Sequence, residues 1–309
     1  MRRILLLALA PLLAIGSTAR AQYARVFVAA KSGNDANACN NVATPCQTFA
    51  GAVSQAHAGG EVIVLESGGY GGVTIAHAVT IGAPAGVTAF IHPASGNAIT
   101  INAGASDVVT LRGLTLNGGG ANGIEADSVG TLNVESCIIT GFFGDGIYMG
   151  SPGRLNVTGT DIRSCNFGIH LANGAGLVKA AVDHCHLDGN FTGYEAATTS
   201  PGGSTTTATS STANGSIAVG WTCGDSGSTG KDVLNLESCT GSENGGAGLY
   251  GNSGNAQTTA IYSNCVFANN GDSGVFCNTT FQTRGNSTIT GNAGGATGGS
   301  GTIAPFSGM

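Results

Sequence analysis

Charged residues are scarce in this chain: Asp, Glu, Lys and Arg together make up only 9% of its 309 residues. Helical bundles and coiled coils need charged side chains on their solvated faces, so this scarcity argues against them. Apolar residues make up 41%, and a charge-driven disordered chain is therefore also disfavoured. Beyond the N-terminus, no apolar stretch is long enough to span a bilayer. The composition therefore indicates a folded protein with little helix and, beyond the N-terminus, no membrane span.

The first 21 residues have the three-part pattern of an export signal. Arg2 and Arg3 precede an apolar run over 4–15, and Ala19-Arg20-Ala21 forms a small-x-small cleavage site. The run is too short to cross a bilayer. The pattern predicts a signal peptide over 1–21 and a secreted, periplasmic or cell-surface protein.

The predicted mature chain is acidic. Removing 1–21 takes away three of the 11 basic residues and none of the 17 acidic ones, which leaves a net charge of about −9. This balance disfavours nucleic acid and anionic membranes as partners. The sequence leaves the oligomeric state open.

Glycine is abundant, with 53 residues, and it belongs to a repeat of about two dozen residues. The segments "LRGLTLNG", "VESCIITG", "VDHCHLDGN" and "YSNCVFANN" illustrate the repeat. Its anchor positions are Leu114, Cys137, Thr160, Cys185, Thr209, Cys239, Cys265 and Ser287. A second apolar column follows, with Gly before six of its seven members: Ile124, Ile147, Ile169, Tyr194, Ile217, Leu249 and Val275.

The spacing within each unit indicates short strands separated by bends. Apolar residues lie three before the anchor, at the anchor and two after it, as in Val134, Cys137 and Ile139. A continuous strand has period two, so a short turn must precede the anchor. Asn tolerates bends and recurs five residues after the anchor, at Asn190, Asn214, Asn244, Asn270 and Asn292. Such units stack into a solenoid of parallel strands, in which equivalent side chains form ladders.

With these features, residues 25–300 resemble the right-handed parallel β-helix proteins of the pectin-lyase-like superfamily. The Asn bends match the asparagine ladder of that fold, and the opening "SGNDANACNNVATPCQTFAGAVSQAHAGGEVIVLESGGYG" is similar to the cap of secreted bacterial members. The resemblance implies an all-β, right-handed parallel β-helix with a short N-terminal capping helix. We expect a cap and first strand over 22–72, the β-helix over 73–300 and a tail over 301–309.

The N-terminal region reads as a cap for the first coil. Thr44-Pro45 can begin a helix, and Phe49, Ala52, Val53 and Ala56 would form its apolar face. Val62–Leu65 is the first buried strand expected. The Thr- and Ser-rich stretch over 198–215 is expected to be a polar coil, and 221–231, which includes the only Trp, an insertion.

Nine Cys in an exported protein suggest some disulfide bonding. Cys39 and Cys46 bracket a short polar loop and are the best candidate pair. Cysteines in the anchor column are expected to be free buried thiols, because Cβ atoms in register on neighbouring coils are too far apart for an undistorted disulfide.

The densest group of ionisable side chains on the predicted surface comprises Asp161, Arg163, His186 and Asp188. In the predicted register, Asp161 lies beside His186 and Arg163 beside Asp188. These groups are candidate catalytic residues that could bind or cleave an acidic sugar chain, with the carboxyl groups as acid and base. The alternative is a set of ladder salt bridges with little energetic weight.

A second outward ladder follows the Gly-apolar column: Glu125, Tyr148, His170, Glu195, Ala218, Tyr250 and Phe276. Tyr148, His170, Glu195, Tyr250 and Phe276 are the candidate substrate-binding residues, because aromatic rings can stack on sugars and polar groups can bond to hydroxyls. The alternative is scattered surface aromatics without a ligand.

His184 and His186, with Asp183 or Asp188, could supply metal ligands, but their spacing is not specific and no metal or other cofactor is predicted. The motifs of polygalacturonase-type hydrolases and the paired calcium-binding acids of pectate lyases are not recognisable. The favoured function is binding of an extracellular or cell-surface polysaccharide. A polysaccharide lyase or glycoside hydrolase, and a structural or adhesive β-helix without a small ligand, remain alternatives.

Overall fold

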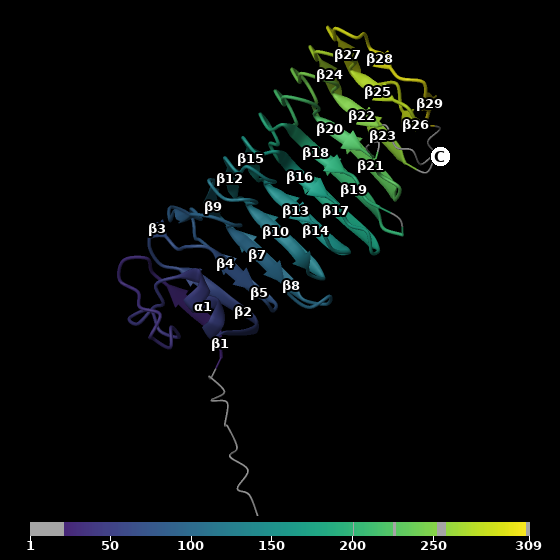
Figure 1. The fold of residues 1–309 in the computed structure, drawn as a ribbon. Helices are drawn as coiled ribbons and strands as arrows, with labels where there is room; N and C mark the ends of the chain where they lie inside the picture. Colours follow the sequence, from purple (N-terminus) through teal and green to yellow (C-terminus); the bar gives the residue numbers. More distant parts are fainter. Residues whose placement is uncertain (1–21, 200, 225–226, 252–257, 307–309) are drawn as a thin grey trace, which may run out of the picture.

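The computed structural model describes residues 22–199, 201–224, 227–251 and 258–306. The predicted signal peptide over 1–21 therefore lies outside the described residues. The described chain winds into a right-handed solenoid of parallel strands, with successive coils stacked along one axis and one helix at the N-terminal end (Figure 1). The predicted fold class is confirmed.

The strands form three faces, and each complete coil contributes one strand to each of the two longer sheets. The twelve-stranded sheet contains, in spatial order, β1 (Tyr23–Val28), β2 (Ala56–Val64), β5 (Val79–Gly82), β8 (Val108–Arg112), β11 (Thr131–Glu135), β14 (Gly153–Thr158), β17 (Leu177–Asp183), β19 (Gly203–Thr209), β21 (Lys231–Glu237), β23 (Thr259–Ser263), β26 (Thr280–Thr283) and β29 (Thr302–Pro305). The ten-stranded sheet contains β4 (Val73–Ile75), β7 (Ile99–Asn102), β10 (Ile124–Ser128), β13 (Ile147–Met149), β16 (Phe167–Leu171), β18 (Thr192–Ala196), β20 (Trp221–Cys223), β22 (Leu249–Gly251), β25 (Val275–Cys277) and β28 (Thr297–Gly298).

The third face is built from shorter strands. A five-stranded sheet contains β3 (Gly68–Gly69), β6 (Ala89–Ile91), β9 (Leu114–Asn117), β12 (Ile138–Thr140) and β15 (Asp161–Arg163). Single bridges through His186, Thr212 and Thr240 continue the face to β24 (Val266–Ala268) and β27 (Thr288–Thr290). We call this whole surface the short-strand face.

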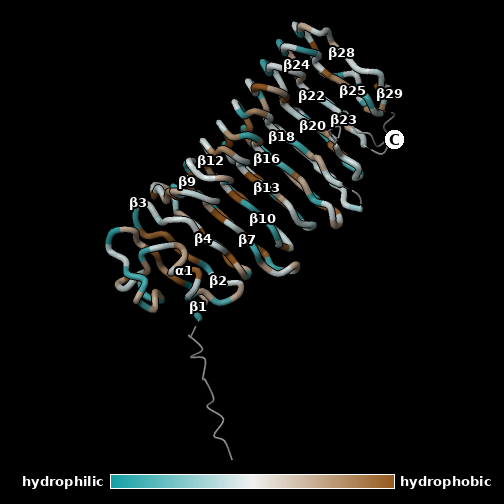
Figure 2. Tube along the Cα trace, viewed as in Figure 1, coloured by the Kyte–Doolittle hydropathy of each residue, from teal (hydrophilic) through white to brown (hydrophobic). Residues whose placement is uncertain are grey.

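The core is a continuous column of apolar side chains inside the coils. Within strands such as β17, buried and exposed residues alternate, as expected for a sheet with one face inward. Figure 2 shows the matching alternation of hydrophobic and hydrophilic residues along the coils. Because a single coil cannot bury its inward residues alone, the stacking of neighbours creates this core.

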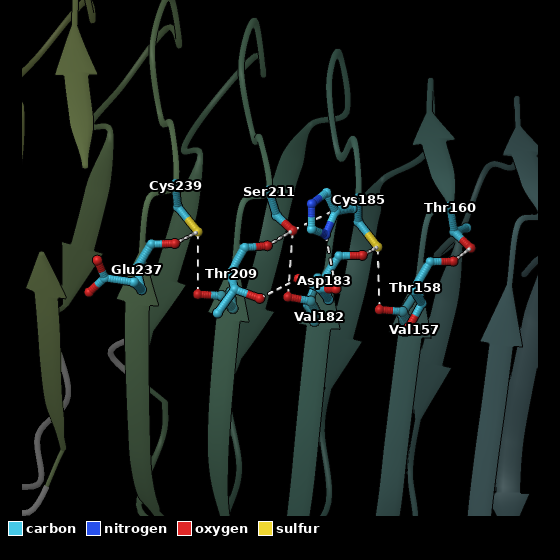
Figure 3. Close-up of polar contacts among 12 residues, drawn as sticks. Val157, Thr158, Thr160, Val182, Asp183, Cys185, Thr209, Ser211, Glu237 and Cys239 are labelled. Carbon is cyan, nitrogen blue, oxygen red and sulfur yellow. Dashed lines mark hydrogen bonds and ion pairs between the residues drawn. The ribbon is translucent and has the colours of Figure 1, made fainter. Parts of the chain in front are cut away.

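The corner between the twelve-stranded sheet and the short-strand face is a turn with one left-handed residue. The residue before the anchor has a positive φ, between 48° and 68°, at Gly113, Ser136, Gly159, His184, Ser210, Ser238 and Asn264. The anchor side chain then turns inward and donates to backbone carbonyls: Cys185 Sγ lies 3.4 Å from the Val157 oxygen and 3.3 Å from the Asp183 oxygen (Figure 3). This turn resets the strand parity, as the spacing predicted.

The second corner contains the predicted asparagine ladder. The Asn270 side-chain amide donates to the oxygen of Gly241 at 3.0 Å and to Asn292 Oδ1 at 2.8 Å. Its own Oδ1 accepts from the backbone and side-chain nitrogens of Asn244, both at 3.0 Å. Asn190, Asn244 and Asn270 are buried, so these bonds satisfy the backbone of a bend that water does not reach.

One coil was predicted in the wrong register: its anchor lies two residues later in the chain than expected. Cys185 pairs with Ser211 rather than Thr209, because Asp183 lies beside Thr209 and the Ser211 hydroxyl accepts from the Cys185 nitrogen at 3.0 Å. The ladder position assigned to Asn214 is therefore occupied by Ser216, whose nitrogen donates to Asn244 Oδ1 at 2.8 Å. This coil has Thr, Ser or Ala at most inward positions, so hydrophobicity did not distinguish the two registers.

Trp221 is a core residue and not part of an insertion. It pairs with Tyr194 and Leu249 in the ten-stranded sheet and is fully buried, whereas Ile217, predicted for this position, is 72% exposed. With Trp221 in place, Gly precedes all seven members of the column. At Gly248 the reason is steric, since a Cβ atom would lie 2.4 Å from the Gly241 oxygen.

The capping helix begins later than predicted. Helix α1 (Phe49–Gln55) is capped by Thr48, whose hydroxyl accepts from the Gly51 nitrogen at 3.0 Å, so Thr44-Pro45 lies outside it. Phe49, Ala52 and Val53 are buried, as expected for its apolar face. Strand β1 precedes the helix and pairs with β2, so Val62–Leu65 is not the first strand of the stack.

The cysteines divide into two groups, and those of the anchor column are free, as predicted. Cys39 and Cys46 form a disulfide, with Cα atoms 5.1 Å apart. The other seven cysteines are free and buried, and burial raises the pKa of the Cys137, Cys165 and Cys185 thiols to about 11. Protonated, inaccessible thiols pack as small apolar groups. Among the described residues, no helix is long and apolar enough to cross a membrane.

Candidate functional site

The predicted ionisable group lies together on the short-strand face. Asp161 bridges to His186 on the next coil, as the sequence predicted. Arg163 and Asp161 form an ion pair on the same strand, with 2.8 Å between the guanidinium and carboxylate atoms. On the next coil, His186 Nδ1 and Asp188 Oδ2 are 3.8 Å apart. The four residues therefore form two pairs within neighbouring coils.

This group is open to water. The side chains of Asp161, Arg163, Asp188 and His186 are 31%, 51%, 40% and 63% exposed, respectively. Asp188 is further held by the Thr212 hydroxyl at 2.9 Å and the Asn214 nitrogen at 2.7 Å. General acid–base chemistry gains most in a site that excludes water, so this geometry favours binding and surface pairing over catalysis.

Asp183 and His184 lie at the adjacent corner. Their side chains are 2.9 Å apart, and the Thr209 hydroxyl also donates to Asp183 (Figure 3). The Thr209 hydrogen bond and the interaction with His184 hold the pKa of the Asp183 carboxyl below its usual range. His184 has the left-handed backbone of the turn, and its ring contacts Asp183 whereas the His186 ring contacts Thr212. Within the described residues, no group of three or more His, Cys, Asp or Glu side chains could hold a metal ion.

The second predicted ladder lies on the outward face of the ten-stranded sheet. We call it the outer ladder, and its register gives Thr74, Thr100, Glu125, Tyr148, His170, Glu195, Thr222, Tyr250 and Phe276. Thr222 occupies the position predicted for Ala218, as follows from the register of Trp221. Glu195 is only 9% exposed and Thr222 only 4%, so the ladder is accessible in two stretches rather than one.

The aromatic rings of the two stretches are arranged differently. Tyr250 and Phe276 stack on each other, with ring centroids 5.1 Å apart and planes at 14°, so each covers one face of the other. Tyr148 instead meets the His170 ring edge-on at 5.4 Å, and it lies over Gly150, where a Cβ atom would come within 2.7 Å of its ring. Phe167 packs on the His170 ring, with ring centroids 4.5 Å apart, so Tyr148 is the ring of this stretch that best suits contact with a sugar ring.

Hydrogen bonds tie this stretch to the polar residues behind it. Asp145 Oδ2 lies 2.8 Å from His170 Nδ1, and the Asp145 nitrogen donates to Asn122 Oδ1 at 2.6 Å. Asn122 in turn donates from its nitrogen to Asn97 Oδ1 at 3.0 Å and from its amide to Glu125. Asp145 holds Nδ1 of His170, so Nε2 is the ring nitrogen left for another partner.

Asp145, Asn122 and Asn97 were not predicted as site residues from the sequence. All three lie shortly before a member of the outer ladder, in the equivalent bend of successive coils. The signal that could have found them is a further polar column two residues before the apolar residues Ile99, Ile124 and Ile147. Only 6% of Asp145 is exposed, so its bond to His170 is shielded from water.

Comparison with known proteins agrees with the fold. A family profile described as "Right handed beta helix region" matches residues 97–229. Among solved structures, the crystal structure of pectate lyase Pel9A aligns with a TM-score of 0.67 at 14% sequence identity. The alignment covers 93% of this chain and 79% of that chain. No curated protein matches the sequence.

The coils and these two matches show the right-handed parallel β-helix fold. The predicted resemblance is thereby confirmed. At 14% identity the solved structure shows the fold alone, and one fold hosts many functions.

Proposed function

We propose that this protein binds an extracellular or cell-surface polysaccharide along the outer ladder. The observation that carries the proposal is the stretch from Glu125 to His170, where rings and hydrogen-bonding groups repeat on neighbouring coils. Rungs recur about every 4.8 Å along the axis, so a linear polymer that lies along the axis meets equivalent groups repeatedly. Tyr148 supplies an apolar ring surface, while Glu125 and His170 supply acceptors and donors for hydroxyl groups. Tyr250 and Phe276 extend the same face beyond the buried Glu195.

An oligosaccharide array with the wild-type protein and two variants tests this proposal. Tyr148→Ala and His170→Ala should each weaken binding about 2- to 10-fold, the range expected for one aromatic contact. Phe143→Ala is the matched control, because Phe143 is 83% exposed and lies outside the outer ladder. Equal losses in all three variants, or none in any, would place binding elsewhere on the molecule.

Cleavage of an acidic polysaccharide at the ionisable group is the second candidate function. It is favoured by the two carboxylates, the guanidinium and the imidazole on neighbouring coils of the short-strand face. Arg163 would neutralise a uronate or act as base, and Asp161 and Asp188 would act as acid and base. An assay for unsaturated products on a panel of polyuronates, together with a reducing-sugar assay, tests it. Activity that survives both Arg163→Ala and Asp188→Ala would exclude this group as the site.

If the array detects no binding and the assays detect no cleavage, a structural or adhesive role is the function that remains. Export through the predicted signal peptide agrees with any of the three roles. N-terminal sequencing of the protein recovered from the medium or periplasm would test cleavage before Gln22.

A further inference from the structure

A cavity of about 560 Å³ lies at the N-terminal end of the outer ladder. Thr74 and Thr100, the first two members of the ladder, line its floor, and Ala50, Val53 and Ser54 of α1 line one wall. Helix α1 lies beside β4 at the end of the stack where the chain begins (Figure 1). The cavity is therefore the place where the ladder meets the cap.

The lining of this cavity combines apolar residues with polar residues that carry no permanent charge. Its polar side chains are Gln22, Ser54, Thr74, His77, Asn97 and Thr100, and no Asp, Glu, Lys or Arg is among the lining residues. Hydroxyl and amide groups of this kind donate to and accept from sugar hydroxyls. A charged ligand would lose hydration here without gaining an ionic partner. The size is within the range of small-molecule sites, roughly 300–1,000 Å³.

Two of the lining residues have hydrogen-bonding capacity that the described chain does not use fully. The Asn97 amide donates to Thr100 Oγ1 at 3.3 Å, a long bond that leaves its second hydrogen for another acceptor. His77 Nε2 is shielded from solvent and has no hydrogen-bond partner within the described residues.

The cavity is also continuous with the ladder through hydrogen bonds. Asn97 Oδ1 accepts from Asn122, which contacts Glu125 and Asp145, and Asp145 holds His170. Burial of the ring, followed by the nearby carboxylates of Glu125 and Asp145, raises the pKa of Tyr148. This concentration of negative charge would repel an anionic polymer approaching the cavity along the ladder.

We propose that the cavity at the cap binds the terminal, uncharged sugar unit of the polysaccharide chain. Because α1 stands across the end of the ladder, a chain that lies on the ladder stops at this wall, and its last unit enters the cavity. The protein would thus recognise the end of a neutral glycan, and the capping helix would serve as part of the binding site. This inference rests on the proposed polysaccharide binding.

Filling the cavity tests the proposal. Ala50 lines the cavity from an exposed position of α1, so Ala50→Trp can occupy the space without disturbing the core. The probe is the neutral oligosaccharide that the wild type binds most tightly on the array, measured by calorimetry. Ala50→Trp should weaken binding at least 10-fold. The matched control, Ala58→Trp, changes an exposed alanine outside the cavity lining and should change binding less than 2-fold. Thr100→Val, which removes one hydroxyl, should have an intermediate effect.

The outcomes separate this inference from the proposed function. Unchanged binding in Ala50→Trp, with loss in Tyr148→Ala, overturns the cavity site and keeps binding on the ladder. Loss in Ala50→Trp without loss in Tyr148→Ala keeps the cavity and overturns the ladder. Binding only to uronate-containing glycans overturns the assignment to neutral sugars. Failure of the wild type to bind any glycan on the array overturns both.

Discussion

The inner corners and the outer faces of the same coils carry ladders of opposite character. At the corners, Cys185 and Asn270 are buried and bonded to the backbone of neighbouring coils. On the outside, Arg163 and His186 are more than half exposed, and their partners are the nearby carboxylates and, for His186, the Thr212 hydroxyl. Both ladders follow from the same stacking, yet only the inner one lacks water as an alternative partner. The free energy of unfolding should therefore depend mainly on the corners, and the outer residues can vary to suit recognition of a ligand.

Replacing Trp221 by Ala should have the largest effect on stability. Trp221 is fully buried between Tyr194 and Leu249, and its Nε1 donates to the Thr240 oxygen at 2.8 Å. Removal of so large a core side chain costs about 3–5 kcal/mol. Urea unfolding followed by circular dichroism measures the loss. If Ile217→Ala, at the exposed position first assigned to this column, costs as much, the register described here is wrong.

Asn270→Ala should have the next largest effect. The change removes two donors and one acceptor from the second corner and leaves the Gly241 oxygen and the Asn244 nitrogen without their partners. Leaving buried backbone groups unsatisfied costs about 1–3 kcal/mol. Asn235→Ala, on the outward face of β21, is the control and should cost much less. Similar losses of stability in Asn270→Ala and Asn235→Ala would mean that the corner contributes no more to stability than the outward face.

Asp232→Asn should change how stability depends on pH. Asp232 is fully buried, and burial raises the pKa of its carboxyl despite hydrogen bonds from Ser204, Ser228 and Thr198. The native state therefore holds the proton more tightly than the unfolded chain, so wild-type stability falls as the pH rises from about 4 through the raised pKa. The variant, which lacks this titration, should be about 1 kcal/mol less stable in acid, because one hydroxyl loses its acceptor.

The difference in the free energy of unfolding between the wild type and Asp232→Asn should then narrow as the pH rises. Unfolding midpoints measured at intervals between acidic and neutral pH test this sign. The surface variant Asp107→Asn provides a control without burial. A difference in stability that widens toward neutral pH would contradict the raised pKa of the Asp232 carboxyl.

Arg163→Ala should have the smallest effect on stability. The pair with Asp161 has 51% and 31% of its side chains exposed, and such surface pairs contribute about 0–1 kcal/mol. Thermal or urea unfolding should therefore scarcely distinguish Arg163→Ala from the wild type. A loss as large as that of Asn270→Ala would remove the contrast between inner corners and outer faces.

The sequence allowed much of this fold to be predicted, because stacking repeats the same requirement in every coil. The anchor column, the Asn bends and the Gly-apolar column are each an inward position that recurs once in every coil. The prediction failed where the coil around Ser211 is polar, since Thr209 and Ser211 are equally plausible at the anchor. The Gly220-Trp221 pair obeys the column rule and was the signal that would have corrected the register.

The candidate site was predicted less completely. The ladders on the outer surface follow directly from the register, so Asp161 beside His186 and Tyr148 beside His170 were foreseen. The burial of Glu195, the stacking of Tyr250 on Phe276 and the bond from Asp145 to His170 were not. These features depend on side-chain packing between coils, which the order of residues along a single coil does not specify.

By itself, the sequence determined the architecture, because a period of about two dozen residues with inward apolar, Cys and Asn positions can be buried only by stacking coils. It also determined the pairing of Cys39 with Cys46, which lie close along the chain. Only the tertiary structure decided which outer residues are accessible and where a cavity opens between α1 and the first rungs. The reason is physical: burial of one inward position repeats in every coil, whereas exposure and cavities depend on how particular side chains from different coils and the cap fit together.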